Sequence, residues 1–90
     1  MKYSIIETDD FLQSIDRLEK ESQNIFELKR ALSIVLSNDP YEFRSDDSGI
    51  HRLQTDELLI KNVPSMIISY KVIESEKVVE LFDLKLVHRD

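Results

Sequence analysis

Side chains that can move protons or hold phosphate groups are concentrated in the second half of this sequence. They are His51, Arg52, Lys61, Lys71, Lys85, His88 and Arg89. Histidine titrates near neutral pH without perturbation, so it can serve as a general acid or base. Arginine and lysine can stabilise the negative charge of a phosphate in a transition state. These residue types could support metal-independent RNA cleavage, in which a base activates the 2′-hydroxyl and an acid protonates the leaving oxygen.

His88 and Arg89 are the candidates nearest the C-terminus. We expect His88 to act as a general acid or base at the open face of a sheet. We expect Arg89 to hold a phosphate through two parallel hydrogen bonds. The alternatives are structural, with His88 as a solvated residue or one that hydrogen-bonds the helix layer, and Arg89 as an exposed terminal residue.

Three further candidates lie within predicted strands: Arg52, Lys61 and Lys85. Arg52 would contact a phosphate or RNA, or would form a cross-strand ion pair, for instance with Glu80 or Asp83. Lys61 and Lys85 would either bind RNA or be solvated charges on the outside of strands. Because side chains alternate along a strand, His51 is expected to point away from Arg52, so the two should not share a site.

Two amphipathic helices are predicted in the first half, where they can support a sheet that carries these residues. Thr8, Asp9 and Asp10 suit a helix start, and the apolar residues that follow, from Phe11 to Leu18, repeat at helical spacing. A second apolar stripe runs from residue 25 to residue 36. Pro40 disfavours helical geometry at the residue before it, so this helix should stop near Ser37.

Strand patterns occupy the rest of the chain. A short strand is predicted at residues 2–7, and further strand segments at 50–54, 58–63, 66–72 and 77–86, with a polar turn at 74–76. In the segment at 66–72 the apolar side chains alternate, which favours a core face, and Phe82, Leu84 and Leu86 should share one side of the last strand. The order β-α-α-β-β-β predicts an α+β fold with two layers, in which the first strand and the helical hairpin pack on one face of an antiparallel sheet.

Composition narrows the function classes. The chain has 90 residues, which suit a single domain over 1–90, and it has no Cys, which excludes disulfides and Cys-based zinc sites. No apolar run is long enough for a signal peptide or a membrane span, so we expect a cytoplasmic protein that does not bind membranes. The acidic residues at 39–47 lack the spacing of a calcium loop, so neither a metal nor a cofactor is expected. The net charge of −6 opposes non-specific binding to nucleic acid.

Five short segments, in order, resemble motifs of the RelE/ParE toxins of bacterial type II toxin–antitoxin modules. They are YSIIETDDFL from residue 3, LSNDPY from residue 36, IHRL from residue 50, MIISYKV from residue 66 and LVHR from residue 86. Each motif alone is weak, but their order and spacing span nearly the whole chain. The resemblance implies a compact toxin that a paired antitoxin neutralises, with His88 at the family's terminal His position and Arg52 at the basic position of its second strand.

The same resemblance implies two alternative actions, ribosome-dependent cleavage of mRNA or, as in the ParE branch, inhibition of DNA gyrase through protein binding. Nuclease members usually carry an Arg at the start of the third strand, where this chain has Ser65 and Met66, and an aromatic residue at the C-terminus, where it has Asp90. A degenerate member without toxicity is a third alternative. Because the charge is −6, we expect an antitoxin whose binding segment is neutral or basic.

Overall fold

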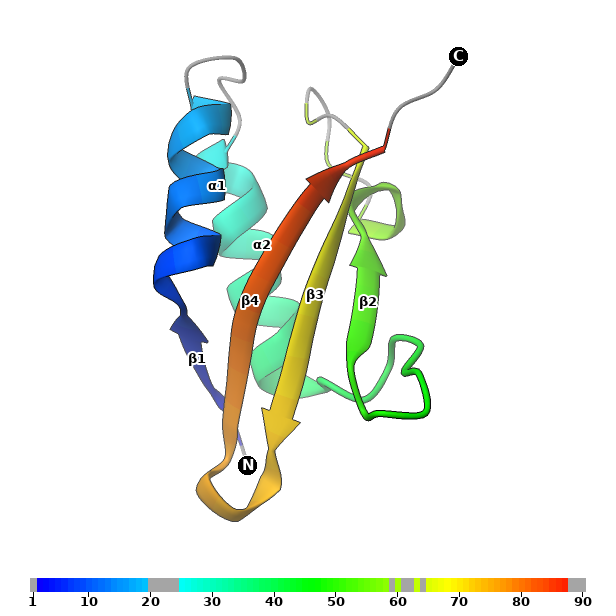
Figure 1. The fold of residues 1–90 in the computed structure, drawn as a ribbon. Helices are drawn as coiled ribbons and strands as arrows, with labels where there is room; N and C mark the ends of the chain where they lie inside the picture. The colour runs from blue at the N-terminus through cyan, green and yellow to red at the C-terminus, as the bar shows by residue number, and fades with distance from the viewer. Residues whose placement is uncertain (1, 20–24, 59, 61–62, 64, 88–90) are drawn as a thin grey trace.

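The structure, a computed structural model, has one strand, two helices and then three strands in chain order (Figure 1). It describes residues 2–19, 25–58, 60, 63 and 65–87. The elements are β1 (Ser4–Glu7), α1 (Asp9–Glu19), α2 (Ile25–Asn38), β2 (His51–Gln54), β3 (Met66–Ile73) and β4 (Val78–Leu86). The predicted α+β class and the predicted order of elements are confirmed.

The start of α1 and the end of α2 lie where local side chains favour them. At the start of α1, the hydroxyl oxygen of Thr8 accepts a hydrogen bond from the backbone N–H of Phe11 at 3.3 Å, and two Asp residues occupy the first turn. The buried residues of α2 are spaced three or four apart: Ile25, Leu28, Leu32 and Leu36. This helix ends at Asn38, just before Asp39 and Pro40, close to the predicted stop.

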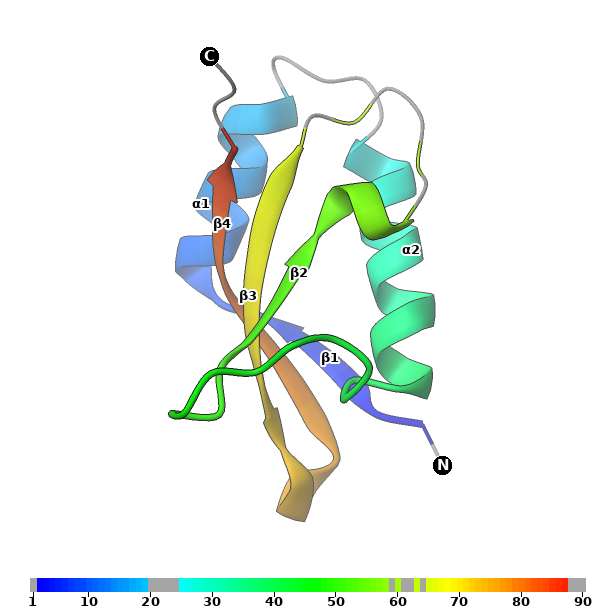
Figure 2. The same cartoon turned by 90° about the vertical axis from the view of Figure 1, so that its right-hand side faces the viewer.

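The four strands form one sheet in the order β1-β4-β3-β2. The antiparallel pairing that we predicted holds for β2 with β3 and for β3 with β4. β1 instead runs parallel to β4, with Ser4 opposite Val78, so the sheet is mixed. A parallel neighbour needs a long crossover connection, and here the chain between β1 and β4 includes both helices. Figure 2 shows the same strands from the side, with α2 on the right and the long loop that leads to β2 passing in front of β1.

The core lies between the helices and one face of the sheet. On β3, Met66, Ile68 and Tyr70 are fully buried, as their alternation predicted, and Phe11 of α1 and Leu28 of α2 are fully buried in the same cluster. Burial of such side chains supplies most of the stability of a small domain.

A β-bulge in β4 changes which residues face the core. Ser69 lies opposite Asp83 and Tyr70 lies opposite Leu81, so Phe82 has no partner on β3. Leu81 and Leu84 are consequently both buried although they are three residues apart. The prediction that Phe82 shares a side with Leu84 is therefore wrong, because the extra residue moves Phe82 to the opposite face of the sheet.

The segment after β2 is not a strand in its described part. Thr55–Leu58 forms a short 3-10 helix, η1, and the described residues of the predicted strand at 58–63 belong to no strand. The hydroxyl oxygen of Thr55 accepts a hydrogen bond from the backbone N–H of Met66 at 3.0 Å, while Ile60 and Val63 pack against the core. The described apolar residues of this segment thus serve packing rather than strand pairing. Among the described helices, none has the length and apolar character needed to cross a membrane.

Candidate functional site

The face of the sheet that points away from the helices carries two transverse rows of side chains. Arg52 on β2, Ser69 on β3 and Asp83 on β4 lie opposite one another in the first row. In the second row Ile67 lies between Gln54 and Lys85. Neighbouring strands are about 4.8 Å apart, so the backbones of the outer members of a row are separated by roughly 10 Å. We refer to this surface as the open face.

Two adjoining depressions occupy the open face. The larger, of about 580 Å³, is lined by Asp10, Arg52, Ile67, Ser69, Phe82, Asp83 and Lys85. The second, of about 370 Å³, is lined by Arg44, Ser45, Asp46, Arg52, Gln54, Glu57 and Ile67. They share Arg52 and Ile67, so Arg52 stands between them. The bulge of β4 brings Phe82 and Asp83 together onto this surface.

Arg52 is held by a loop rather than by a neighbouring strand. Its Nη1 donates to Oδ2 of Asp46 at 2.7 Å. The cross-strand ion pair with Glu80 or Asp83, one of the two alternatives for Arg52, is therefore wrong, because the loop before β2 folds back and brings Asp46 within reach of Arg52. Glu80 pairs instead with Lys71, at 3.5 Å.

Asp46 organises the turn from which it projects. Its Oδ1 accepts hydrogen bonds from the backbone N–H of Ser48 at 2.9 Å, from the Ser48 hydroxyl at 2.6 Å and from the backbone N–H of Ile50 at 3.1 Å. The hydrogen bonds from Ser48 and then from Arg52 hold the pKa of Asp46 well below its ordinary value. The carboxylate is thus ionised at neutral pH and fixes the guanidinium of Arg52 above the sheet.

The charges on the described part of the open face are mixed. The charged residues lining the two depressions are Arg44, Arg52, Lys85, Asp10, Asp46, Glu57 and Asp83. Carboxylates outnumber cations in this set, whereas proteins that bind nucleic acid non-specifically derive most of their affinity from an excess of positive charge. Cations here can make individual phosphate contacts, but the surface as a whole does not attract a polyanion.

His51 lies on the other face of the sheet, as its alternation with Arg52 predicted. It is buried and stacks on Tyr70 with ring centroids 5.0 Å apart, while its Nδ1 lies 3.0 Å from the carbonyl oxygen of Phe43. Tyr41 meets the outer side of the imidazole edge to face, at 5.7 Å. These contacts give His51 a structural role in holding the loop between α2 and β2.

A polar cluster at the β3–β4 turn, where β4 begins, connects three parts of the chain. Oε2 of Glu74 accepts hydrogen bonds from the hydroxyls of Tyr3 at 2.7 Å and Tyr41 at 2.6 Å, and Oε1 accepts one from the ammonium of Lys77. Lys77, followed by the two tyrosines, lowers the pKa of Glu74 to about 2, and the bond to Glu74 raises the pKa of Tyr41 to about 12. The cluster connects the start of the chain, the loop after α2 and the β3–β4 turn.

The structure brings together two of the five predicted site residues. Arg52 and Lys85 line the same depression. His88, Arg89 and Lys61 lie outside the described residues. Sequence reasoning missed Ser69, Phe82 and Asp10 at this surface and treated Asp83 only as a partner for Arg52. No local signal marks the bulge that places Phe82 and Asp83 here. In the described part of the chain, no group of three or more His, Asp or Glu side chains is arranged to hold a metal ion.

Comparison with known proteins rests on structure. No known protein family and no curated protein matches the sequence. The fold matches a solved structure of the E. coli toxin RelE, a double arginine-to-alanine mutant in the free state, with a TM-score of 0.69 over 96% of this chain and 84% of that one. The chain has a RelE-like fold. This confirms the fold that the five sequence motifs implied, and the sequence identity of 16% limits the comparison to the fold.

Proposed function

We propose that this protein is the toxin of a type II toxin–antitoxin module. The observation that carries the proposal is the fold match to a RelE toxin along almost the entire chain. The five motifs in the sequence point to the same family independently of the coordinates. In this proposal the toxin acts in the cytoplasm without a cofactor, and an antitoxin keeps it inactive by binding it.

Cleavage of mRNA on the ribosome is the first candidate action, and the cations of the open face support it through individual phosphate contacts. Arg52 and Lys85 border one depression and could hold two successive phosphates of an RNA strand. Asp83, two residues before Lys85 on β4, lines the same depression and could accept a proton from a 2′-hydroxyl. His88 and Arg89 stay in the proposal as general acid and phosphate ligand, and Lys61 as a further RNA contact, on the strength of the sequence.

Inhibition of DNA gyrase by protein binding is the second candidate. The specific observation in its favour is the charge on the open face, where carboxylates outnumber cations among the lining residues. A mixed surface with apolar members such as Ile67 and Phe82 is typical of a contact with protein rather than with a polyanion.

Controlled expression in a bacterial host tests these actions. Growth arrest is expected on induction, and primer extension on mRNA should find cuts in phase with codons if the protein cleaves at the ribosome. DNA damage without such cuts would indicate gyrase as the target. A chain that folds and accumulates yet leaves growth unchanged would overturn the proposal.

A pair of double variants tests the open face. Arg52→Ala with Lys85→Ala should abolish growth arrest, because it removes both cations of the larger depression. Arg17→Ala with Arg30→Ala is the matched control, since it removes the same charge from exposed positions on α1 and α2. Equal toxicity of the two double variants would show that the open face is not the active surface.

A further inference from the structure

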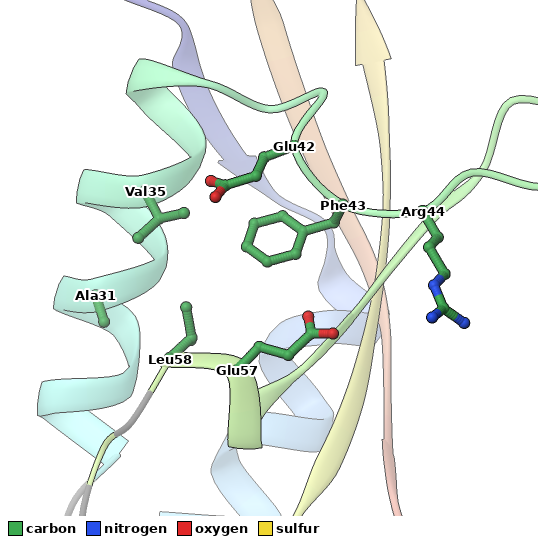
Figure 3. A pocket seen from close by; sticks show the side chains of 7 residues that line it. All are labelled: Ala31, Val35, Glu42, Phe43, Arg44, Glu57 and Leu58. Atoms are coloured by element: carbon green, nitrogen blue, oxygen red, sulfur yellow. The ribbon is translucent and has the colours of Figure 1, made fainter.

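A pocket of about 460 Å³ lies between α2, the loop that follows it and η1 (Figure 3). Ala31 and Val35 of α2 form one wall, and Phe43 and Leu58 face them from the loop and from η1. These four side chains are apolar and only partly buried. These residues therefore form an apolar recess on the flank of the described core.

The apolar surface continues outside the pocket along α2. Ile34 lies three residues after Ala31, so the two are neighbours on the helix surface. The side chain of Ile34 is 54% exposed, which is high for a large aliphatic residue in a small soluble protein. Ile34 thus extends the apolar surface of the recess along α2, and this surface suits an apolar side chain from another molecule.

Two carboxylates border the recess. Glu42 and Glu57 take part in none of the ion pairs formed among the described residues. Arg44 lines the same pocket, but Figure 3 shows its guanidinium pointing away from the recess. The same carboxylates affect Tyr70. Its pKa is raised mainly by burial and, to a smaller extent, by the negative charges of Asp39, Glu42 and Glu57. Among the described residues, the recess thus combines an apolar floor with an acidic rim that forms no ion pair.

We infer that this pocket is the docking site for a segment of the antitoxin that inserts an aliphatic side chain and places a Lys or Arg beside Glu42 and Glu57. The inference rests on the proposed function for the identity of the partner. The chemistry of the segment follows from the pocket, because an acidic rim repels an acidic segment and a basic residue would satisfy both carboxylates.

The size of the pocket limits what can enter it. A volume of about 460 Å³ suits one or two side chains rather than a whole helix, whose diameter is about 10 Å. The occupant is therefore an anchor residue of a segment that lies along α2 and over Ile34. Since Arg44 and Glu57 also border the smaller open-face depression, a segment seated here would reach the edge of the proposed active surface.

A titration with a defined probe tests the docking chemistry. The probe is a short amphipathic peptide of Leu, Ala and Lys, and its control is the same peptide with Glu in place of Lys. Amide NMR spectra of the isotope-labelled chain should shift at Ala31, Val35 and Phe43 with the basic peptide and stay unchanged with the acidic one. Equal shifts with both peptides, or shifts confined to other residues, would overturn the inference.

Two variants locate the contact. Ala31→Phe fills the recess and should abolish the shifts, whereas Ser33→Phe adds the same ring at an exposed position on α2 and should not. Glu42→Gln with Glu57→Gln should weaken peptide binding by about fivefold, the effect expected for two exposed ion pairs. Asp47→Asn with Glu76→Gln makes the same change of net charge at exposed sites away from the pocket and should bind as the unmodified chain does.

The outcomes separate this inference from the proposed function. Peptide binding does not require toxicity, so a chain that binds the basic peptide at the pocket but never arrests growth would refute the toxin assignment and leave the docking chemistry intact. A toxic chain on which Ala31→Phe leaves peptide binding unchanged would refute the docking site alone. The amide spectrum of each variant reports whether it folds. If Ala31→Phe does not fold, the double variant Glu42→Gln with Glu57→Gln provides the second test.

Discussion

Replacing Tyr70 by Phe removes a hydroxyl that ties the core of β3 to the loop after α2. Tyr70 is fully buried, and its hydroxyl donates to the carbonyl oxygen of Pro40 at 2.6 Å. Phe keeps the ring, including its stacking on His51, so the substitution isolates the hydrogen bond. The loop that begins at Pro40 also carries Asp46, which holds Arg52 over the open face.

The expected loss follows from burial of the acceptor. The variant leaves the Pro40 carbonyl without its donor, and an unsatisfied buried polar group costs about 1–3 kcal/mol. A domain of this kind has a total stability of about 5–15 kcal/mol, so the loss is a substantial fraction of the whole. With a urea dependence of about 1–3 kcal/mol per molar, the unfolding midpoint should fall by roughly 1 M.

Equilibrium unfolding in urea measures this change. The matched control is Tyr41→Phe, which removes a hydroxyl of similar hydrogen-bond length, but one that donates to the exposed carboxylate of Glu74, where water can replace it. The midpoint should fall more for Tyr70→Phe than for Tyr41→Phe, at an unchanged urea dependence. An unaltered midpoint for Tyr70→Phe, or a larger fall for Tyr41→Phe, would refute the assignment of the buried bond as the stronger tether.

Two further predictions concern pH and packing. Folding lowers the pKa of Asp46, so this carboxylate stabilises the fold above its ordinary pKa of 3.8, and that stabilisation is lost as the pH falls through the folded pKa. The difference in unfolding free energy between the natural chain and Asp46→Asn should therefore be constant near neutral pH and should shrink below about pH 4. Thermal unfolding across that range checks this, and a gap independent of pH would contradict it. Leu28→Ala should cost about 2–5 kcal/mol because Leu28 is fully buried, whereas Ile34→Ala, at an exposed position, should change stability by less than about 0.5 kcal/mol in the same urea assay.

Periodicity predicted the parts of the fold that depend on local burial. The stripe from Ile25 to Leu36 identifies α2, and the alternation from Met66 to Tyr70 identifies the core face of β3. In both cases the buried members, such as Leu28 and Ile68, face the core directly, so their spacing in the sequence equals their spacing along the element. The face on which Arg52 lies followed from the same alternation.

Features set by distant parts of the chain could not be predicted in this way. The parallel pairing of β1 with β4 depends on how the two helices between them lead the chain back to the sheet, not on the residues of β1. The bulge at Phe82 depends on how β4 fits β3 and α1, and nothing in the apolar pattern of β4 distinguishes Phe82 from Leu81. The ion pair between Asp46 and Arg52 spans only six residues, but it depends on the turn at Asp46, which the strand pattern does not reveal.

The pairing of Arg52 with Asp46 shapes how the open face would meet either proposed target. The pair is exposed, so an incoming phosphate or carboxylate can replace Asp46 at little energetic cost, while in the free protein the pair keeps the guanidinium in place. Since the lining charges do not sum to a strong positive field, a target of the proposed active surface would be selected by the arrangement of Arg52, Asp83 and Lys85 rather than by long-range attraction. A ribosome or a gyrase would therefore have to bring its own contacts to this face, and those contacts, not the net charge of the domain, would determine which target is recognised.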